Sequence, residues 1–121
     1  TGGRTYTYRG AQLMPRSSSP SLVGFQLGSF GDFTTEFSTN ALRMSLMVTV
    51  YENAMRYPFE SSGRPGFSLG GMGRGCNMLA ARFQIHALNS DATGLTEFQA
   101  TFEQRCEGGS SAARGCIVWR R

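Results

Sequence analysis

The sequence contains no lysine and only one histidine, His86, and these absences already narrow its chemistry. All twelve basic residues are arginine, and the net charge of +4 comes from cations that are scattered singly and adjoin only at Arg120 and Arg121. Nucleic-acid binding normally uses a clustered basic stripe or arginines interleaved with aromatic residues. We therefore expect no nucleic-acid partner and attribute the arginine bias to a GC-rich coding genome.

Long apolar runs are missing as well. No stretch comes near the roughly 20 consecutive apolar residues that a membrane-spanning helix needs, so we expect no transmembrane segment. The apolar core of a signal peptide is also missing, and Thr1 is either the mature end left by signal removal or a boundary without meaning. Three cysteines without a CxxC pair favour disulfides outside the cytoplasm over a zinc site.

The parts of the common catalytic sites are absent. A catalytic triad would need His86 beside a nucleophile and a carboxylate, but this residue falls on the polar face of its expected strand. The eight carboxylates are dispersed, and the glycine-rich stretch 68–75 has neither the GxxxxGK spacing nor the following helix of a phosphate loop. The oxygen-rich turn 89–94 lacks the EF-hand pattern. We therefore predict that the protein is not an enzyme and has no catalytic residue, cofactor or metal site.

What the chain does contain points to one β-rich domain. A length of 121 residues suits a single domain spanning residues 1–121, and a charged fraction of only 17% argues against disorder. Nine phenylalanines supply core side chains, although Leu, Ile, Val and Phe together make up only about a fifth of the chain. Sixteen glycines suit many tight turns between short strands.

Alternation of polar and apolar residues predicts short strands, because successive side chains on a strand point to opposite faces. The expected strands cover residues 5–9, 21–27, 32–39, 42–50, 67–69, 77–88, 95–106 and 115–120. Residues 15–21 are expected to form a loop, and residues 51–57 are ambiguous between a strand and one helical turn. Eight or so short strands with frequent turns predict an all-β fold, an antiparallel β-sandwich, with a closed antiparallel β-barrel as the alternative.

The best-defined feature is a hairpin with arms at 77–88 and 95–106 and a turn at 89–94. Four of its side chains are expected in the core: Phe83, Ile85, Phe98 and Phe102. Inward positions are odd-numbered on the first arm and even-numbered on the second. With a six-residue turn, this parity places Phe83 opposite Ala100.

The aromatic side chains leave two interpretations open. Tyr6, Tyr8 and Trp119 form a ligand-stacking platform for carbohydrate, or they pack in or against the core. The sequence pattern alone does not decide between the two.

Four motifs in the second half of the chain resemble a group of secreted bacterial β-rich proteins of unknown function. They are residues 51–59 (YENAMRYPF), 64–66 (RPG), 73–77 (GRGCN) and 98–109 (FQATFEQRCEGG). The resemblance covers residues 51–119, a little over half of the chain. This sequence departs from the pattern at Arg105, where the relatives usually carry histidine, and at Cys116, where they usually carry a residue other than cysteine.

The resemblance implies export and a disulfide between the two characteristic cysteines, here Cys76 and Cys106. The expected hairpin brings both to its open end. In the simplest register Cys76 has the wrong parity to face Cys106, so it must lie in the glycine-rich loop or beside a β-bulge. Cys116 is left over, either as a free thiol or as the site of a bond between chains. No catalytic residue follows from the resemblance.

Two kinds of function fit this sequence. The first is a non-enzymatic structural or adhesive surface protein, a self-assembling subunit of an extracellular fibre or coat, whose partners are copies of itself or a cell-surface component. Many strand edges, with no lysine to block them, favour this function. The second is a secreted carbohydrate-binding module. Either protein would be extracellular, at the cell surface or in the periplasm.

Overall fold

The computed structural model describes residues 12–28, 31–71, 79–106 and 112–121. These residues form eight strands and one 3-10 turn. The elements are β1 (Leu13–Ser19), β2 (Leu22–Leu27), β3 (Phe33–Ser38), η2 (Asn40–Leu42), β4 (Val50–Arg56), β5 (Gly66–Gly71), β6 (Leu79–Asp91), β7 (Gly94–Cys106) and β8 (Ala112–Arg120). The predicted all-β class is confirmed.

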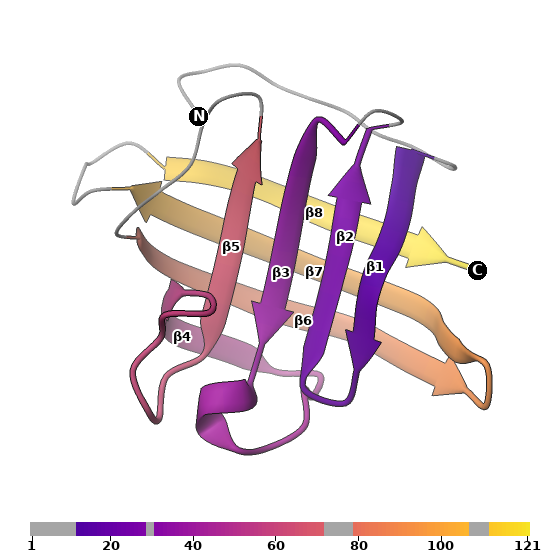
Figure 1. Ribbon diagram of the computed structural model, residues 1–121, viewed down its shortest axis with the longest axis horizontal. Coiled ribbons are helices and arrows are strands. Elements are labelled where there is room, and N and C mark those ends of the chain that lie inside the picture. Colours follow the sequence, from indigo (N-terminus) through magenta and orange to yellow (C-terminus); the bar gives the residue numbers. More distant parts are fainter. Residues whose placement is uncertain (1–11, 29–30, 72–78, 107–111) are drawn as a thin grey trace.

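The strands join into one mixed sheet in the order β1-β2-β3-β5-β4-β6-β7-β8. Every neighbouring pair is antiparallel except β4 and β5, which run parallel and share only the pairs Met55–Gly66 and Arg56–Phe67. Beyond this joint the sheet folds back on itself. Strands β1, β2, β3 and β5 then form one layer, and β4, β6, β7 and β8 form the other, with the strands of the two layers crossing (Figure 1). The sheet is nearly closed, and the fold is thus an all-β arrangement of the predicted sandwich or barrel kind.

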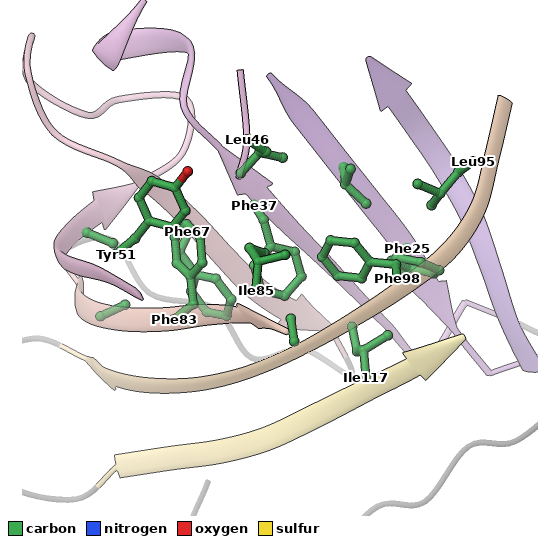
Figure 2. Close-up of a cluster of buried hydrophobic side chains, with 14 of the residues drawn as sticks. Phe25, Phe37, Leu46, Tyr51, Phe67, Phe83, Ile85, Leu95, Phe98 and Ile117 are labelled. Atoms are coloured by element: carbon green, nitrogen blue, oxygen red, sulfur yellow. The ribbon is translucent and has the colours of Figure 1, made fainter. Parts of the chain in front are cut away.

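Phenylalanines from both layers fill the space between them. Phe25, Phe37, Phe67, Phe83 and Phe98 are each at most 2% exposed, and their rings meet between the layers in Figure 2. Phe37 is central: its ring centroid lies 5.2–5.3 Å from those of Phe67, Phe83 and Phe98. Aromatic rings at this spacing attract one another in addition to the gain from removing their apolar area from water. The core therefore joins β3 directly to β6 and β7 of the opposite layer.

The predicted hairpin is present as β6 and β7, and the four core residues predicted on it are confirmed. Phe83, Ile85 and Phe98 are buried and Phe102 is partly buried against the same core. The predicted pairing is wrong by two residues, because Phe83 pairs with Phe102 and not with Ala100, although both are inward positions. The two arms extend further than expected and meet at the Asp91–Gly94 pair, so the turn holds two residues instead of six.

The predicted strand at 42–50 is wrong. Its residues connect β3 in one layer to β4 in the other. Alternation would place five apolar residues on one face, of which only Leu46 is buried: Leu42, Met44, Leu46, Val48 and Val50. Local bonds set this path: the Thr39 hydroxyl donates to the Met44 carbonyl at 2.6 Å, and Arg43 adopts a left-handed backbone with φ 56°. The Leu46 N–H donates to the Pro20 carbonyl at 2.8 Å, which fixes the connection against the first layer.

Two other segments also differ from expectation. Residues 15–21 are not a loop, since most of them belong to β1, which pairs with β2 across Ser17–Gly24 and neighbouring positions. Proline is tolerated there because β1 is an end strand and Pro15 does not need to donate on its open side. Residues 51–57 are mostly strand β4, with a bulge at which Asn53 takes a positive φ of 58°. The predicted strand at 5–9 lies outside the described residues.

Candidate functional site

The outer face of β6, β7 and β8 carries a network of paired charges. Glu103 accepts hydrogen bonds from Arg114 Nε and Arg105 Nη2, both at 3.0 Å. The hydrogen bond from Arg114 is the main cause of the lowered pKa of Glu103. A hollow of about 190 Å³ lies on this face between Arg82, Arg114 and Glu103. Its charged groups are already engaged, because Arg82 lies 3.4 Å from Glu52 and Arg114 is bonded to Glu103.

A second carboxylate on this face is held in the same way. Glu97 accepts hydrogen bonds from Arg120 Nε at 3.0 Å, Asn89 Nδ2 at 2.8 Å and Gln99 Nε2 at 3.1 Å. The Arg120 bond, followed by the Asn89 bond, lowers the pKa of Glu97. A carboxylate with a lowered pKa is fully ionised at neutral pH and is a poor proton donor. Glu97 and Glu103 are therefore suited to stabilising this surface through ion pairs and not to acting as general acids.

His86 lies on the same outer face and is exposed. Its Nε2 atom is 3.0 Å from Thr101 Oγ1, a neighbour across the hairpin. Hence His86 takes part in a cross-strand hydrogen bond. Within the described ranges, no group of three or more His, Cys, Asp or Glu residues is arranged to hold a metal ion.

The cysteines occupy different positions on the last two strands. Cys116 lies on β8 opposite Thr101 and is the free cysteine of the described residues, with its side chain exposed. Cys106 ends β7 and is not free. Its predicted partner, Cys76, lies outside the described residues, so the bridge between them stays a prediction.

One end of the sheet is formed by β8, whose outer edge has no partner among the described strands. Among the described strands β8 pairs only with β7, so the backbone of residues 112–120 has a side facing away from the sheet, here called the β8 edge. Val118 on β8 is 61% exposed. Open strand edges carry backbone donors and acceptors that can pair with another chain.

The opposite end strand, β1, is better protected. Pro15 cannot donate a backbone hydrogen bond, and the register of β1 shifts between Pro15 and Ser17. A proline and a bulge are two of the features with which sheets discourage edge-to-edge pairing. Of the two end strands, β8 is thus the more open to a second chain.

The outer face of the first layer bears a row of small and polar residues. Ser17, Gly24, Glu36 and Ser68 lie directly opposite one another on β1, β2, β3 and β5. Ser68 Oγ donates to Glu36 Oε1 at 2.9 Å. Because residue 24 has no side chain, a hollow of about 180 Å³ remains above it. We call this the Gly24 hollow, and its lining includes Arg16, Ser17, Gly24, Thr34 and Glu36.

Acidic groups and a phenol continue this row beyond β5. The Tyr57 backbone N–H donates to the Phe67 carbonyl at 3.1 Å, which places residue 57 next to β5. Partial burial raises the pKa of the Tyr57 phenol, and the nearby negative charges of Glu36 and Glu60 raise it further. Glu60 Oε2 is buried and accepts no hydrogen bond from the described part of the chain. The row thus combines an aromatic ring with carboxylate and hydroxyl oxygens.

The aromatics singled out in the sequence do not form this row. Trp119 is partly buried, and its ring packs edge-on against Phe25, with the centroids 5.9 Å apart. Tyr6 and Tyr8 lie outside the described residues. The Gly24 hollow was missed because its residues come from separate strands. The available signal was a glycine inside the strand 21–27, which often marks a close approach to the backbone.

Comparisons with known proteins give no relative for this chain. It matches no protein-family model, no curated protein and no solved structure. The resemblance to secreted bacterial proteins therefore stays a prediction. Within the part of the chain that the structure describes, no helix has the length and apolar character needed to cross a bilayer.

Proposed function

We propose that this protein is a non-enzymatic structural or adhesive protein that associates with copies of itself through the β8 edge. The observation that carries the proposal is an end strand of nine residues that pairs only with β7 among the described strands. Strand addition to such an edge supplies a ladder of backbone hydrogen bonds, and exposed side chains such as Val118 add apolar contact. No special residue type is needed for this kind of association.

The side chains of the outer faces support a binding role over turnover. Glu97 and Glu103 are engaged by arginines, and His86 bonds to Thr101. The cysteines suit an exported protein, extracellular, at the cell surface or in the periplasm, because disulfides persist in oxidising compartments. A fibre or coat subunit of the cell surface would combine these properties.

Sedimentation of the reduced protein tests the proposal. We expect the wild type to associate as its concentration rises through the micromolar range, since edge pairing is a reversible, mass-action process. Val118→Lys places a hydrated cation on the β8 edge and should weaken association at least about tenfold. Val50→Lys is the matched control, since Val50 is also exposed, at 41%, but lies on β4 within the sheet.

Two results would overturn self-association through the β8 edge. One is a wild-type protein that sediments as a monomer at every concentration, with or without reductant. The other is equal association of the Val118→Lys and Val50→Lys variants, which would place the contact away from the β8 edge.

Carbohydrate binding at the Gly24 hollow is a second candidate. The hollow combines a guanidinium, a carboxylate and two hydroxyls within one small space, from Arg16, Glu36, Ser17 and Thr34. Sugar hydroxyls both donate and accept hydrogen bonds, so such a mixed set complements them. Tyr57, close to Glu36, offers a ring for stacking, although part of this ring is buried.

A glycan array followed by calorimetry tests this candidate. Glu36→Gln keeps the size of the side chain but removes its charge, and we expect binding of any sugar found to weaken about tenfold, as loss of a charge-assisted hydrogen bond does. Glu52→Gln, on the outer face of β4, is the matched control. Absence of binding on the array, or equal binding by the two variants, would remove the Gly24 hollow from consideration.

A further inference from the structure

The β8 edge has a symmetric centre. Strand β8 runs from Ala112 to Arg120, so Cys116 is its middle residue, with four strand residues on each side. When two identical strands pair antiparallel over their full length, the middle residue lies opposite its own copy on a two-fold axis. Full pairing of two β8 edges therefore sets Cys116 against the Cys116 of the second copy.

Side-chain sizes in β8 fit this register. With Cys116 on the axis, Trp119 lies opposite Ala113, Ile117 opposite Gly115, and Arg114 opposite Val118 of the other copy. Directly opposed side chains on one face of an antiparallel pair are the closest cross-strand neighbours. In two of these three pairs a large residue faces a small one, and in none do two like charges meet.

The neighbouring registers fit less well. If the axis passes through Ile117, Arg114 lies opposite Arg120 of the other copy, and like charges that face each other destabilise a strand pair. If the axis passes through Gly115, Trp119 and Arg120 have no opposing strand residue, and the ladder is shorter. The register centred on Cys116 is therefore the one that pairs the whole strand without a charge conflict.

We propose that two copies of this chain pair antiparallel along their β8 edges with Cys116 on the two-fold axis, and that a disulfide between the two Cys116 residues then locks the pair. The inference rests on the proposed self-association and adds its register and its covalent step. Opposed Cα atoms in an antiparallel pair lie about 4.5–5.5 Å apart. Disulfides span Cα separations of about 4.4–6.8 Å, so the strand geometry accommodates the bond.

The oxidant in this step is a low-molecular-weight disulfide. One Cys116 thiolate attacks a sulfur of the small disulfide, which forms a mixed disulfide and releases one small thiolate. The second Cys116 thiolate attacks the protein sulfur of the mixed disulfide and releases the other small thiolate. The protons that leave the two Cys116 thiols go to these thiolates, so one small disulfide is reduced to two thiols for each protein disulfide formed.

Two-fold pairing of β8 also limits the assembly. An isologous contact uses the same surface on both copies and is complete after two. The locked dimer is thus the unit from which a fibre or coat would be built, and further growth would need another surface.

The experiment measures covalent dimer formation with oxidised glutathione, by non-reducing electrophoresis and intact mass. We expect a dimer whose mass equals two chains minus two hydrogens, and none from Cys116→Ser. The Val118→Lys substitution puts a positive charge opposite Arg114 of the other copy and should slow dimer formation at least about tenfold. The Val118→Glu substitution puts a negative charge opposite the same arginine, so this variant should form the dimer as fast as the wild type or faster.

Matched controls separate the register from general effects of charge. Val50→Lys and Val50→Glu should both dimerise like the wild type, and circular dichroism should show that all variants are folded. Equal rates of dimer formation by Val118→Lys and Val118→Glu would overturn the register, because random collisions of exposed thiols do not depend on the charge at position 118.

Two further outcomes separate this inference from the proposed function. If Val118→Lys weakens association but the wild type forms no disulfide at Cys116, this inference is overturned and the proposed function stands. A monomer under reducing and oxidising conditions would overturn both.

Discussion

Asp91 Oδ1 accepts two hydrogen bonds from Thr93, one from its backbone N–H at 2.8 Å and one from its hydroxyl at 2.7 Å. These bonds join the last residue of β6 to the second residue of the turn that leads to β7. Arg121 adds bonds of its own, to Asp91 Oδ2 and to Thr93 Oγ1. The hydroxyl bond, the backbone bond and then Arg121 lower the pKa of Asp91 to about 2.

Asp91 should therefore make stability depend on pH in the acid range. Its pKa in the folded protein lies below the usual value near 3.9, so its contribution is full above that value and is lost as the pH falls through about 2. Asp91→Asn keeps an acceptor oxygen but removes the charge, and should lower the Tm at neutral pH. We expect the Tm difference to shrink as the pH falls toward about 2, in thermal unfolding followed by circular dichroism. Thr93→Val should reduce this pH dependence, and a difference that stays constant with pH would contradict the explanation.

Phe37 should be among the most sensitive core positions. Its side chain is fully buried, and its ring lies within 5.3 Å of three other phenylalanine rings. Phe37→Ala should lower the free energy of unfolding by about 3–5 kcal/mol in urea titrations, because it removes apolar contact and leaves a cavity. Phe59→Ala is the control, since Phe59 is 68% exposed, and should change stability by about 0.5 kcal/mol or less. Similar losses for the two variants would contradict the central place of Phe37.

Gly71 should tolerate a methyl group less well than Gly94. Both have positive φ values, 152° and 127°, so alanine strains the backbone at either site. A Cβ at residue 71 would meet the Asp32 carbonyl oxygen at 2.0 Å, whereas a Cβ at residue 94 would meet no atom of the described residues within 4 Å. Gly71→Ala should therefore cost about 1–3 kcal/mol more than Gly94→Ala, because the clashing atom belongs to the backbone. If Gly71→Ala and Gly94→Ala have the same midpoint in chemical unfolding, β3 and β5 can move apart to accommodate the methyl group.

The bridge between Cys76 and Cys106 predicts a simple labelling result. Alkylation of the monomer without reductant should modify one cysteine per chain, Cys116, which is the exposed free thiol of the described residues. Intact-mass measurement counts the labels, and digestion maps them. Three labels per chain would contradict a bridge between Cys76 and Cys106. Cys106→Ser should then cost about 2–4 kcal/mol of stability, as loss of a native disulfide usually does.

The sequence predicted which faces of the long strands are buried better than how the strands pair. Alternation around Phe83 and Phe98 identified the inward positions, because burial on one face leaves a period of two in the sequence. The pairing of Phe83 with Phe102 depended on how many residues the turn uses. The turn holds only two residues, and the Asp91 side chain accepts a hydrogen bond from one of them, Thr93. The alternation of polar and apolar residues contains no information about such a bond.

The connection 42–50 shows a different limit. Its alternation is genuine, yet the segment has to pass from one layer to the other, and most of its apolar side chains are exposed. Periodicity reports the local preference of a segment for strand structure, and the connection that the tertiary fold requires can override this preference. Likewise, the Gly24 hollow depends on which strands become neighbours, and β3 and β5 are joined around the intervening β4. The free Cys116, in contrast, was recognisable as the cysteine left over from the expected bridge.

The short parallel joint between β4 and β5 has a consequence for the order of folding. Strands β1, β2 and β3 pair in chain order, as do β6, β7 and β8, so each group can form from local contacts. Across the joint, the Met55 N–H donates to the Pro65 carbonyl at 2.9 Å and the Tyr57 N–H to the Phe67 carbonyl at 3.1 Å. We expect the two groups to form early and independently, and the amide hydrogens at the joint to exchange with solvent faster than those of Phe83 or Phe98. Docking of two preformed halves, and not hairpin closure, would then set the folding rate of the chain.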